Sequence, residues 1–216
     1  MKQNLVEVVF IMDRSGSMYP LQQDSIGGFN AMLSKQQQEE GTAYVTTFLF
    51  NQQSEILHDR IDIKDVKPLT LNDYQVGGCT ALYDCLGEAI KHIDMVHKYI
   101  KDDDKPEKVI FVITTDGYEN ASHKFNKRKI KKMIEEKTKK GWEFIYLAAN
   151  IDAASTANEI GIEESRTCNY HHDAFGVENV YASVSEAIVQ CRRSKKLSES
   201  WCDQVRQDYN SRKGTK

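Results

Sequence analysis

The sequence predicts an α/β fold: a doubly wound, mainly parallel central sheet with helices on both faces. Two observations predict it. Extended and helical patterns alternate along the chain, which is typical of strand–helix–strand units. Two extended runs, 5–12 and 108–113, are almost entirely apolar, as expected of strands that are covered on both faces. Because crossovers between parallel strands are right-handed, these units favour a doubly wound arrangement.

The first half of the chain supplies three expected strands. Residues 5–12 form the first, and residues 42–50, rich in β-branched and aromatic side chains, form the second. Residues 54–57 are expected to add a short edge strand after a turn. A helix between the first two strands is indicated by apolar residues at helical spacing: Ile26, Phe29, Met32 and Leu33.

The second half continues the alternation. A long helix carries its apolar face on Leu82, Cys85, Leu86, Ala89, Ile93, Val96 and Ile100, and the acidic run 102–104 and Pro106 end it. After the strand 108–113 come a lysine-rich helix, a strand over 142–149 and a short strand over 167–170. The lysine-rich helix and a closing helix are indicated by Ile130, Met133 and Ile134, and by Val177, Val180, Val184, Ile188 and Cys191.

Length and composition indicate one folded domain. A chain of 216 residues with 40% hydrophobic and 28% charged residues is globular rather than disordered. We expect the domain over residues 1–193, followed by a polar, weakly patterned tail over 194–216 that is a source of disorder. The net charge of -3 gives no overall attraction to nucleic acid or to anionic membranes.

The expected location is the cytoplasm. The N-terminal apolar run is interrupted by Glu7, which does not fit a signal peptide, and no stretch approaches the length of a membrane span. The five cysteines are odd in number and contain no C-x-x-C pair, a pattern typical of reduced thiols in a cytosolic protein.

Polar residues cluster where the predicted strands end. Residues 13–17 read Asp-Arg-Ser-Gly-Ser, Asp116-Gly117 follows the buried strand near 108–113, and Gly77-Gly78-Cys79-Thr80 precedes the long helix. In doubly wound sheets, ligands bind at the carboxyl ends of strands where the strand order reverses. We therefore expect the first strand and the strand near 108–113 to be neighbours, with Asp13, Asp116 and the Thr80 loop at one rim.

The residue types at this rim point to a hard divalent cation. Carboxylate and hydroxyl oxygens suit Mg²⁺ or Mn²⁺ better than Zn²⁺ or copper. Alternate positions of an extended loop project to one side, so Asp13, Ser15 and Ser17 can face one ion. Gly16 lets the backbone turn between the two serines.

The three pieces in this order resemble a known motif. D-x-S-x-S, a distant Thr and a later T-D-G are similar to the metal-ion-dependent adhesion site of von Willebrand factor A-type domains, and the resemblance covers roughly residues 4–193 by element order. It implies a von Willebrand A fold over residues 1–193 and a Mg²⁺ (or Mn²⁺) site. The implied metal ligands are Asp13, Ser15, Ser17, Thr80 and Asp116.

The resemblance also implies a function. It favours a small intracellular, bacterial or phage-type protein that is not an enzyme and has no catalytic residues. Such a module would bind an Asp or Glu of a protein partner through the metal, as an adaptor in a multiprotein machine that can include an AAA+ ATPase. The chain contains no P-loop, so that ATPase would be a separate subunit.

Two alternatives come from other classes of protein. A metal-dependent phosphoester hydrolase could use the same rim, although no general base or phosphate-cradling glycine loop stands there and the first motif lacks the second Asp of D-x-D phosphotransferases. A nucleic-acid binder could use residues 124–140, which hold nine basic and two acidic residues. The helical spacing of the apolar residues there favours an ordinary surface helix with a solvated basic face.

Other polar residues are interpreted as structural. His171 and His172 are adjacent and should point to opposite faces, so both cannot easily bind one ion, and Asp173 is placed to cap the closing helix. Cys79 lies beside Thr80 with no evident histidine base. Arg14 should point away from the ion and either steadies an acidic partner or makes a surface contact. Trp201 either packs back on the domain or meets a partner.

Overall fold

A computed structural model of the chain describes residues 5–194 and 197–212. Its centre is a six-stranded sheet of order β3-β2-β1-β4-β5-β6. Every neighbouring pair is parallel except β2 and β3, which are antiparallel. The strands are β1 (Leu5–Asp13), β2 (Thr42–Phe50), β3 (Ser54–Asp62), β4 (Lys108–Thr115), β5 (Glu143–Ala148) and β6 (Thr167–Asn169).

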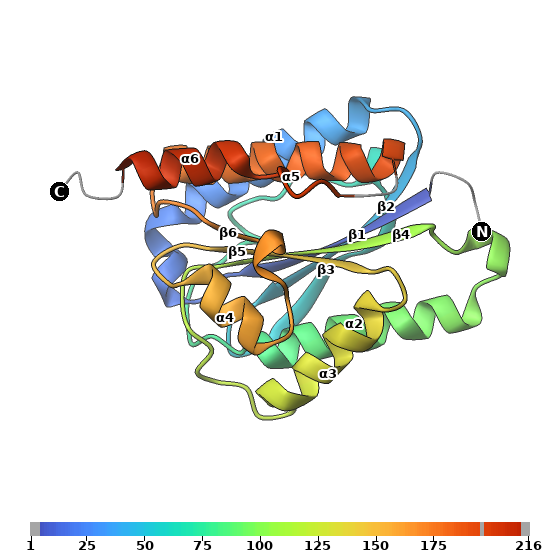
Figure 1. The fold of residues 1–216 in the computed structure, drawn as a ribbon, viewed down its shortest axis with the longest axis horizontal. Coiled ribbons are helices and arrows are strands. Elements are labelled where there is room, and N and C mark those ends of the chain that lie inside the picture. The colour runs from blue at the N-terminus through green and yellow to red at the C-terminus, as the bar shows by residue number, and fades with distance from the viewer. Residues whose placement is uncertain (1–4, 195–196, 213–216) are drawn as a thin grey trace.

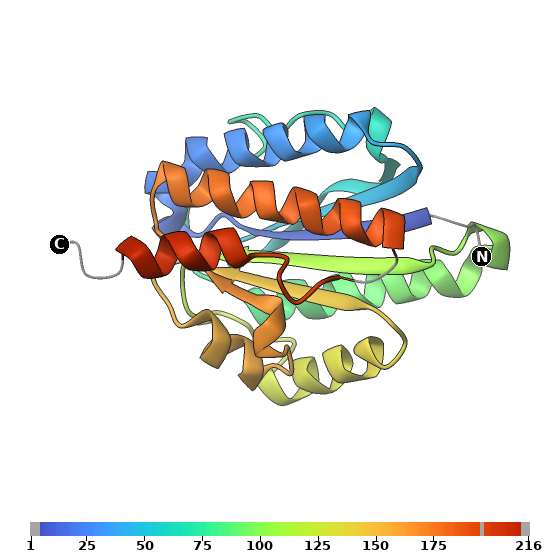
Figure 2. The same ribbon diagram turned by 45° about the horizontal axis from the view of Figure 1, so that its top comes forward.

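Helices cover both faces of this sheet, as Figures 1 and 2 show. The layer of α1, α5 and α6 lies on one face, and the layer of α2, α3 and α4 lies on the other. Their bounds are α1 (Gln22–Gln38), α2 (Leu82–Tyr99), α3 (Lys127–Thr138), α4 (Ala153–Glu159), α5 (Ala174–Ser194) and α6 (Asp203–Arg212). The predicted doubly wound fold is confirmed.

The strand β1 shows why apolar runs predict central strands. Val8 and Phe10 belong to the core under α1 and α5, whereas Val9 and Ile11 belong to the core over α2 and α3. Successive side chains of a strand point to opposite faces, so a strand covered on both sides needs apolar residues at nearly every position. The sheet thus has two cores, one on each face.

The strand order reverses between β1 and β4. These strands pair in parallel, with Val6 opposite Lys108 and Met12 opposite Thr114. From β1 the chain continues outward to β2 and β3, and from β4 it continues the other way to β5 and β6. The carboxyl ends of β1 and β4 therefore lie side by side, as predicted, at the point where doubly wound sheets bind ligands.

Three elements, β3, α4 and α6, differ from the expectations. The edge strand β3 extends from Ser54 to Asp62 rather than ending at residue 57, because its pairing with β2 continues through register shifts around Thr47. The short helix α4 was not predicted. Its seven residues include only two buried side chains, Ala153 and Ala157, which is too little for a visible helical pattern.

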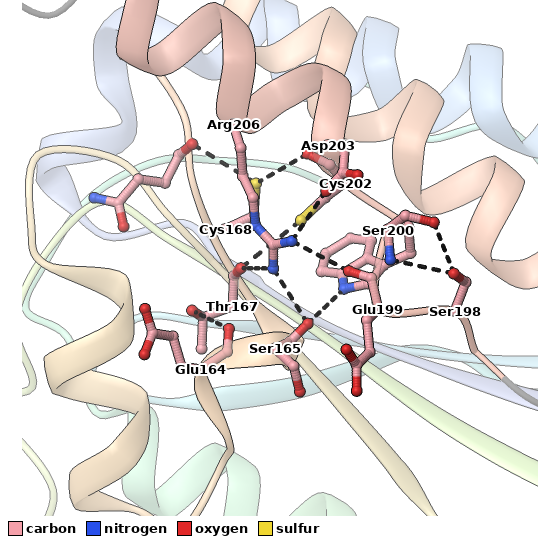
Figure 3. A network of polar contacts seen from close by, with 12 residues as sticks. Glu164, Ser165, Thr167, Cys168, Ser198, Glu199, Ser200, Cys202, Asp203 and Arg206 are labelled. Atoms are coloured by element: carbon pink, nitrogen blue, oxygen red, sulfur yellow. Dashed lines mark hydrogen bonds and ion pairs between the residues drawn. The ribbon is translucent and has the colours of Figure 1, made fainter.

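The expected disordered tail is wrong for residues 203–212, which form α6. Before this helix, Trp201 is buried and its Nε1 donates to the Ser165 carbonyl at 2.9 Å, so the indole packs back on the domain. Figure 3 shows how Arg206 of α6 reaches β6: its guanidinium donates to the carbonyls of Ser165, Thr167 and Glu199. The helix is thus held by tertiary contacts, which its polar sequence does not reveal.

The sequence predicted free thiols and no membrane span, and the structure bears on both. Within the described ranges all five cysteines are free; Cys79 is exposed, and Cys85, Cys168, Cys191 and Cys202 are buried. The prediction that Cys85 belongs to the core is confirmed. In the same part of the chain, no helix is long and apolar enough to cross a membrane.

Candidate metal centre

Asp13 is the last residue of β1 and is fully buried. Its Oδ1 accepts a hydrogen bond from the Ser15 backbone N–H at 2.7 Å, and its Oδ2 accepts one from the Thr115 hydroxyl at 2.6 Å. The Tyr74 hydroxyl donates to the Asp13 carbonyl. Both the carboxylate and the backbone of Asp13 are therefore fixed in one orientation.

Burial is costly for this carboxylate. Desolvation raises the pKa of Asp13 from 3.8 to about 6, although the hydrogen bonds from Thr115 and Ser15 oppose the shift, and the nearby Asp116 adds to it. Two carboxylates of one sign facing the same rim favour a positive charge between them. The electrostatics of the site therefore suit a cation.

The two serines connect Asp13 to the end of β4. The Ser15 and Ser17 Oγ atoms lie 3.2 Å apart, and the Ser17 hydroxyl donates to Asp116 Oδ1 at 2.5 Å. Ser15 and Asp116 are buried, whereas Ser17 is exposed. The row of oxygens therefore runs from the interior to the surface at the junction of β1 and β4.

The Thr80 loop closes the third side. The Gly16 N–H donates to the Gly78 carbonyl at 3.0 Å, and the Gly77 N–H donates to the Arg14 carbonyl at 2.9 Å, which ties this loop to the serine loop. Gly78 has a φ of +82°, a conformation that favours glycine. The loop thereby brings Thr80 to the rim occupied by Asp13 and Asp116.

Gly117 marks the space between these loops. A Cβ added there would lie 3.5 Å from the Ser17 Oγ and 3.8 Å from the Thr80 Oγ1. Both hydroxyls thus border one small space, which a side chain at residue 117 would fill. The structure brings all five residues predicted from the sequence to this rim: Asp13, Ser15, Ser17, Thr80 and Asp116.

Residues that sequence reasoning missed hold Thr80 in place. The Asn120 side chain accepts from the Thr80 N–H at 2.9 Å, and the Asn120 N–H donates to the Thr80 carbonyl at 2.9 Å. The Glu119 carboxylate accepts from the Tyr83 N–H at 2.8 Å, in the first turn of α2. This pairing joins the loop after β4 to the start of α2.

Asp84 makes the reverse connection. Its carboxylate accepts from the backbone N–H groups of His123, Lys124 and Phe125 at 2.8–2.9 Å. Burial alone would raise the pKa of Asp84, but these three donors outweigh it and lower the pKa. The sequence shows only the two acidic residues themselves, Asp84 in the first turn of α2 and Glu119 in the loop after β4. It could not reveal their contacts, because Asp84 and its three donors lie 39, 40 and 41 positions apart.

His172 is a further residue at the site that the sequence did not predict. Its Nε2 lies 3.1 Å from Asp116 Oδ2, a contact with the rim that the interpretation of this histidine as structural did not include. The two adjacent histidines contact different partners, since His171 Nε2 lies 3.0 Å from the Tyr209 carbonyl. Asp173 caps α5, as predicted, by accepting from the Gly176 N–H at 2.8 Å.

Arg14 and Cys79 lie beside the rim without joining the row of oxygens. Arg14 forms an ion pair with Glu55 at 2.9 Å and donates to the Asp73 carbonyl at 3.4 Å, so the contact that it makes is within the chain. Cys79 is exposed, and its backbone N–H donates to the Gln52 side chain at 3.0 Å.

The donor set fits a hard cation. Two carboxylates and three hydroxyls offer only oxygen atoms, the ligands that Mg²⁺ and Mn²⁺ prefer. In the described ranges, no group of three or more His, Cys, Asp or Glu side chains is arranged to hold a metal ion. Since the Ser17 hydroxyl directs its proton to Asp116, it accepts from the Ser15 hydroxyl on one lone pair and can turn the other toward a cation.

Comparisons with known proteins agree on the fold. No family model and no curated protein sequence matches the chain. Proximal thread matrix protein 1 from the mussel byssus, solved with a zinc-occupied MIDAS motif, superposes with a TM-score of 0.58 at 14% identity over 88% of this chain and 47% of its own. A von Willebrand factor type A protein from Catenulispora acidiphila gives 0.57 at 15% identity over 87% and 43%.

A pilus adhesin is also similar. SpaC from Lactobacillus rhamnosus GG gives a TM-score of 0.67 at 11% identity over 88% of this chain and 31% of its own. The chain therefore spans about half the length of the first two proteins and less than a third of the adhesin. At such identities the similarity shows the fold, and the fold of this chain is that of a von Willebrand factor A-type domain.

Proposed function

We propose that this protein is a metal-dependent protein-interaction module rather than an enzyme. It binds Mg²⁺ or Mn²⁺ through oxygens of Asp13, Ser15, Ser17, Thr80 and Asp116, and through the ion it engages an Asp or Glu of a partner. The observation that carries the proposal is the row of oxygens from Asp13 through the two serines to Asp116, at the reversal of strand order.

The five proposed ligands differ in charge and in exposure. Asp13 and Asp116 together offset two positive charges, while the hydroxyls add neutral oxygens. Asp13, Ser15, Thr80 and Asp116 are buried and Ser17 is exposed, so an incoming group can approach from the side of Ser17. A divalent ion there would supply an electrostatic contact for a partner's carboxylate, the hard anionic ligand that a protein most readily provides.

The zinc-occupied MIDAS motif of the mussel byssus protein, which is similar in fold, supports the binding of a divalent metal. The choice of Mg²⁺ or Mn²⁺ rests on the donor set alone. As the setting we propose the cytoplasm and an assembly in which an AAA+ ATPase is a separate subunit.

Contacts of the lysine-rich helix weigh against nucleic acid as the ligand. Lys127 pairs with Glu159 at 2.5 Å, and just before the helix Lys124 pairs with Glu88 at 2.5 Å. Lys137 pairs with Asp94 and lies over the Trp142 ring. Part of the basic charge is therefore neutralised within the chain.

The test is calorimetric titration with Mn²⁺ and Mg²⁺. Wild type should bind one ion and Asp13→Ala should not. The matched control Asp65→Ala removes an exposed carboxylate just after β3, whose last residue, Asp62, pairs with Tyr44 near the start of β2, and it should bind as wild type does. Partner capture should then depend on the metal and be lost in EDTA. Metal binding that survives Asp13→Ala would reject the site, and turnover of a phosphoester that requires these residues would reject the interaction role.

A further inference from the structure

His172 contacts the metal centre from an element that the motif does not include. It lies between β6 and α5, and its Nε2 is 3.1 Å from Asp116 Oδ2. The other oxygen of this carboxylate, Oδ1, accepts from the Ser17 hydroxyl at 2.5 Å. The side chains of His172 and Asp116 are 19% and 1% exposed, so both are shielded from competing water.

In this arrangement each oxygen of Asp116 contacts a different side chain. A carboxylate has two oxygens and can rotate about its Cβ–Cγ bond, so one hydrogen bond does not fix its plane. With the imidazole on Oδ2 and Ser17 on Oδ1, rotation would break one of the two contacts. The position of the Ser17 hydroxyl, and of the lone pair that it can offer to a cation, therefore depends on His172.

The residues on either side of His172 are held by α6. His171 Nε2 lies 3.0 Å from the Tyr209 carbonyl, and its ring packs on the Tyr209 ring at 4.8 Å between centroids. Asp173 pairs with Arg212 at 2.6 Å. The His172 backbone is thus fixed to α6 at the preceding and at the following residue.

The start of α5 limits the segment from a third side. A Cβ added at Gly176 would lie 2.1 Å from the His171 carbonyl oxygen, so only glycine permits this close approach. The segment 171–173 is therefore packed between α5, α6 and the end of β4. These contacts leave the imidazole little freedom to leave Asp116.

We infer that His172 is a positioning residue of the metal centre, and that α6 sets its position through His171 and Asp173. The inference rests on the proposed metal site and adds to it a residue outside the motif. It also gives a role to α6: the helix maintains the geometry of a site to which it contributes no ligand.

The first test is Mn²⁺ affinity measured by calorimetry. His172→Ala should weaken binding by about tenfold, the lower end of the loss seen when a residue supporting a metal ligand is removed. His172→Gln, whose amide N–H can still donate to Asp116, should recover much of it. The control His123→Ala removes an exposed imidazole but keeps the backbone N–H that donates to Asp84, so it should bind as wild type does.

The outcomes separate the inference from the proposed function. If wild type binds no Mn²⁺, the metal site itself is wrong. If wild type binds and His172→Ala binds equally well, or if the Ala and Gln variants lose the same affinity, the positioning role is wrong. The unfolding midpoint of the metal-free variants reports structural damage separately, and the rescue by Gln is not expected from damage alone.

The second test concerns α6 and uses a double-mutant cycle. Arg212→Gln removes the ion pair with Asp173. In the wild-type background this substitution should weaken Mn²⁺ binding by about threefold, whereas in the His172→Ala background it should have no effect. Arg128→Gln, on the exposed face of α3, is the control. A threefold loss in both backgrounds would show that Arg212 does not act through His172 and would overturn this part of the inference.

Discussion

The Ser17 hydroxyl donates a hydrogen bond of 2.5 Å to Asp116 Oδ1, across 99 positions of the sequence. It joins the loop after β1 to the end of β4, the two strands between which the sheet reverses its order. Asp13 is held in the same way by Thr115, at 2.6 Å and 102 positions away. Each acidic residue of the rim is thus hydrogen-bonded to the neighbouring strand's loop or end, and these bonds orient both carboxylates.

Metal binding should stabilise the fold. A ligand present at 100 times its Kd, and bound by the native state alone, adds about 2.7 kcal/mol to the free energy of unfolding. We expect Mg²⁺ or Mn²⁺ to raise the melting temperature of wild type and to leave that of Asp13→Ala unchanged. Differential scanning calorimetry checks this, and an equal rise in both proteins would contradict it.

The stability of the metal-free protein should depend on pH through Asp13. Its pKa is raised from 3.8 to about 6, so the native state binds the proton more tightly than the unfolded chain does. The stability that Asp13 contributes is therefore fully present below about pH 4 and is lost as the pH rises to about 6. A difference of about two pKa units corresponds to about 3 kcal/mol.

Urea denaturation of wild type and Asp13→Asn between pH 4 and pH 7 measures this effect. The difference between the two proteins cancels the contributions of the other carboxyl groups. We expect wild type to lose most of this difference of about 3 kcal/mol relative to Asp13→Asn as the pH rises. A difference that does not change with pH would refute the prediction.

A side chain at residue 117 should block the site without unfolding the protein. In Gly117→Ala the new methyl group would lie at ordinary contact distance, 3.5 Å from the Ser17 hydroxyl and 3.8 Å from that of Thr80. We expect Mn²⁺ affinity to fall by at least about tenfold, with the melting temperature of the metal-free protein little changed. The matched control is Gly77→Ala, where the added Cβ meets no atom within 4 Å; equal affinities in the two variants would contradict the prediction.

Arg192 of α5 should be a large contributor to stability. Its guanidinium donates to the carbonyls of Gln36, Glu39, Glu40 and Gly41 at 2.7–3.1 Å, and the residue is buried. Arg192→Ala removes the guanidinium donors from these carbonyls around the end of α1, and we expect a loss of about 3 kcal/mol in chemical denaturation.

The neighbouring Arg193 provides the comparison for that measurement. Its side chain is 72% exposed and pairs with Glu39, so Arg193→Ala should cost less than about 1 kcal/mol. If the two variants are equally stable, the carbonyl contacts of Arg192 contribute little and the prediction is wrong.

The sequence by itself determined the sheet and the rim. Strands β1 and β4 were visible because burial on both faces requires long apolar runs, and α2 was visible because one buried face repeats at helical spacing. Asp13, Ser15 and Ser17 lie close in sequence, so their grouping could be read directly. Asp116 could be placed beside them because strand order in a doubly wound sheet follows general rules.

The tertiary structure alone decided what surrounds this rim. His172 reaches Asp116 across 56 positions, and Asp84 reaches the loop at residues 123–125 across about 40, with no repeat in the sequence that links them. The helix α6 has a single buried residue, Val205, within its bounds, so amphipathic spacing could not reveal it. Local patterns report which side chains avoid water, whereas a polar contact depends on where two distant segments meet, and that is determined only when the chain packs.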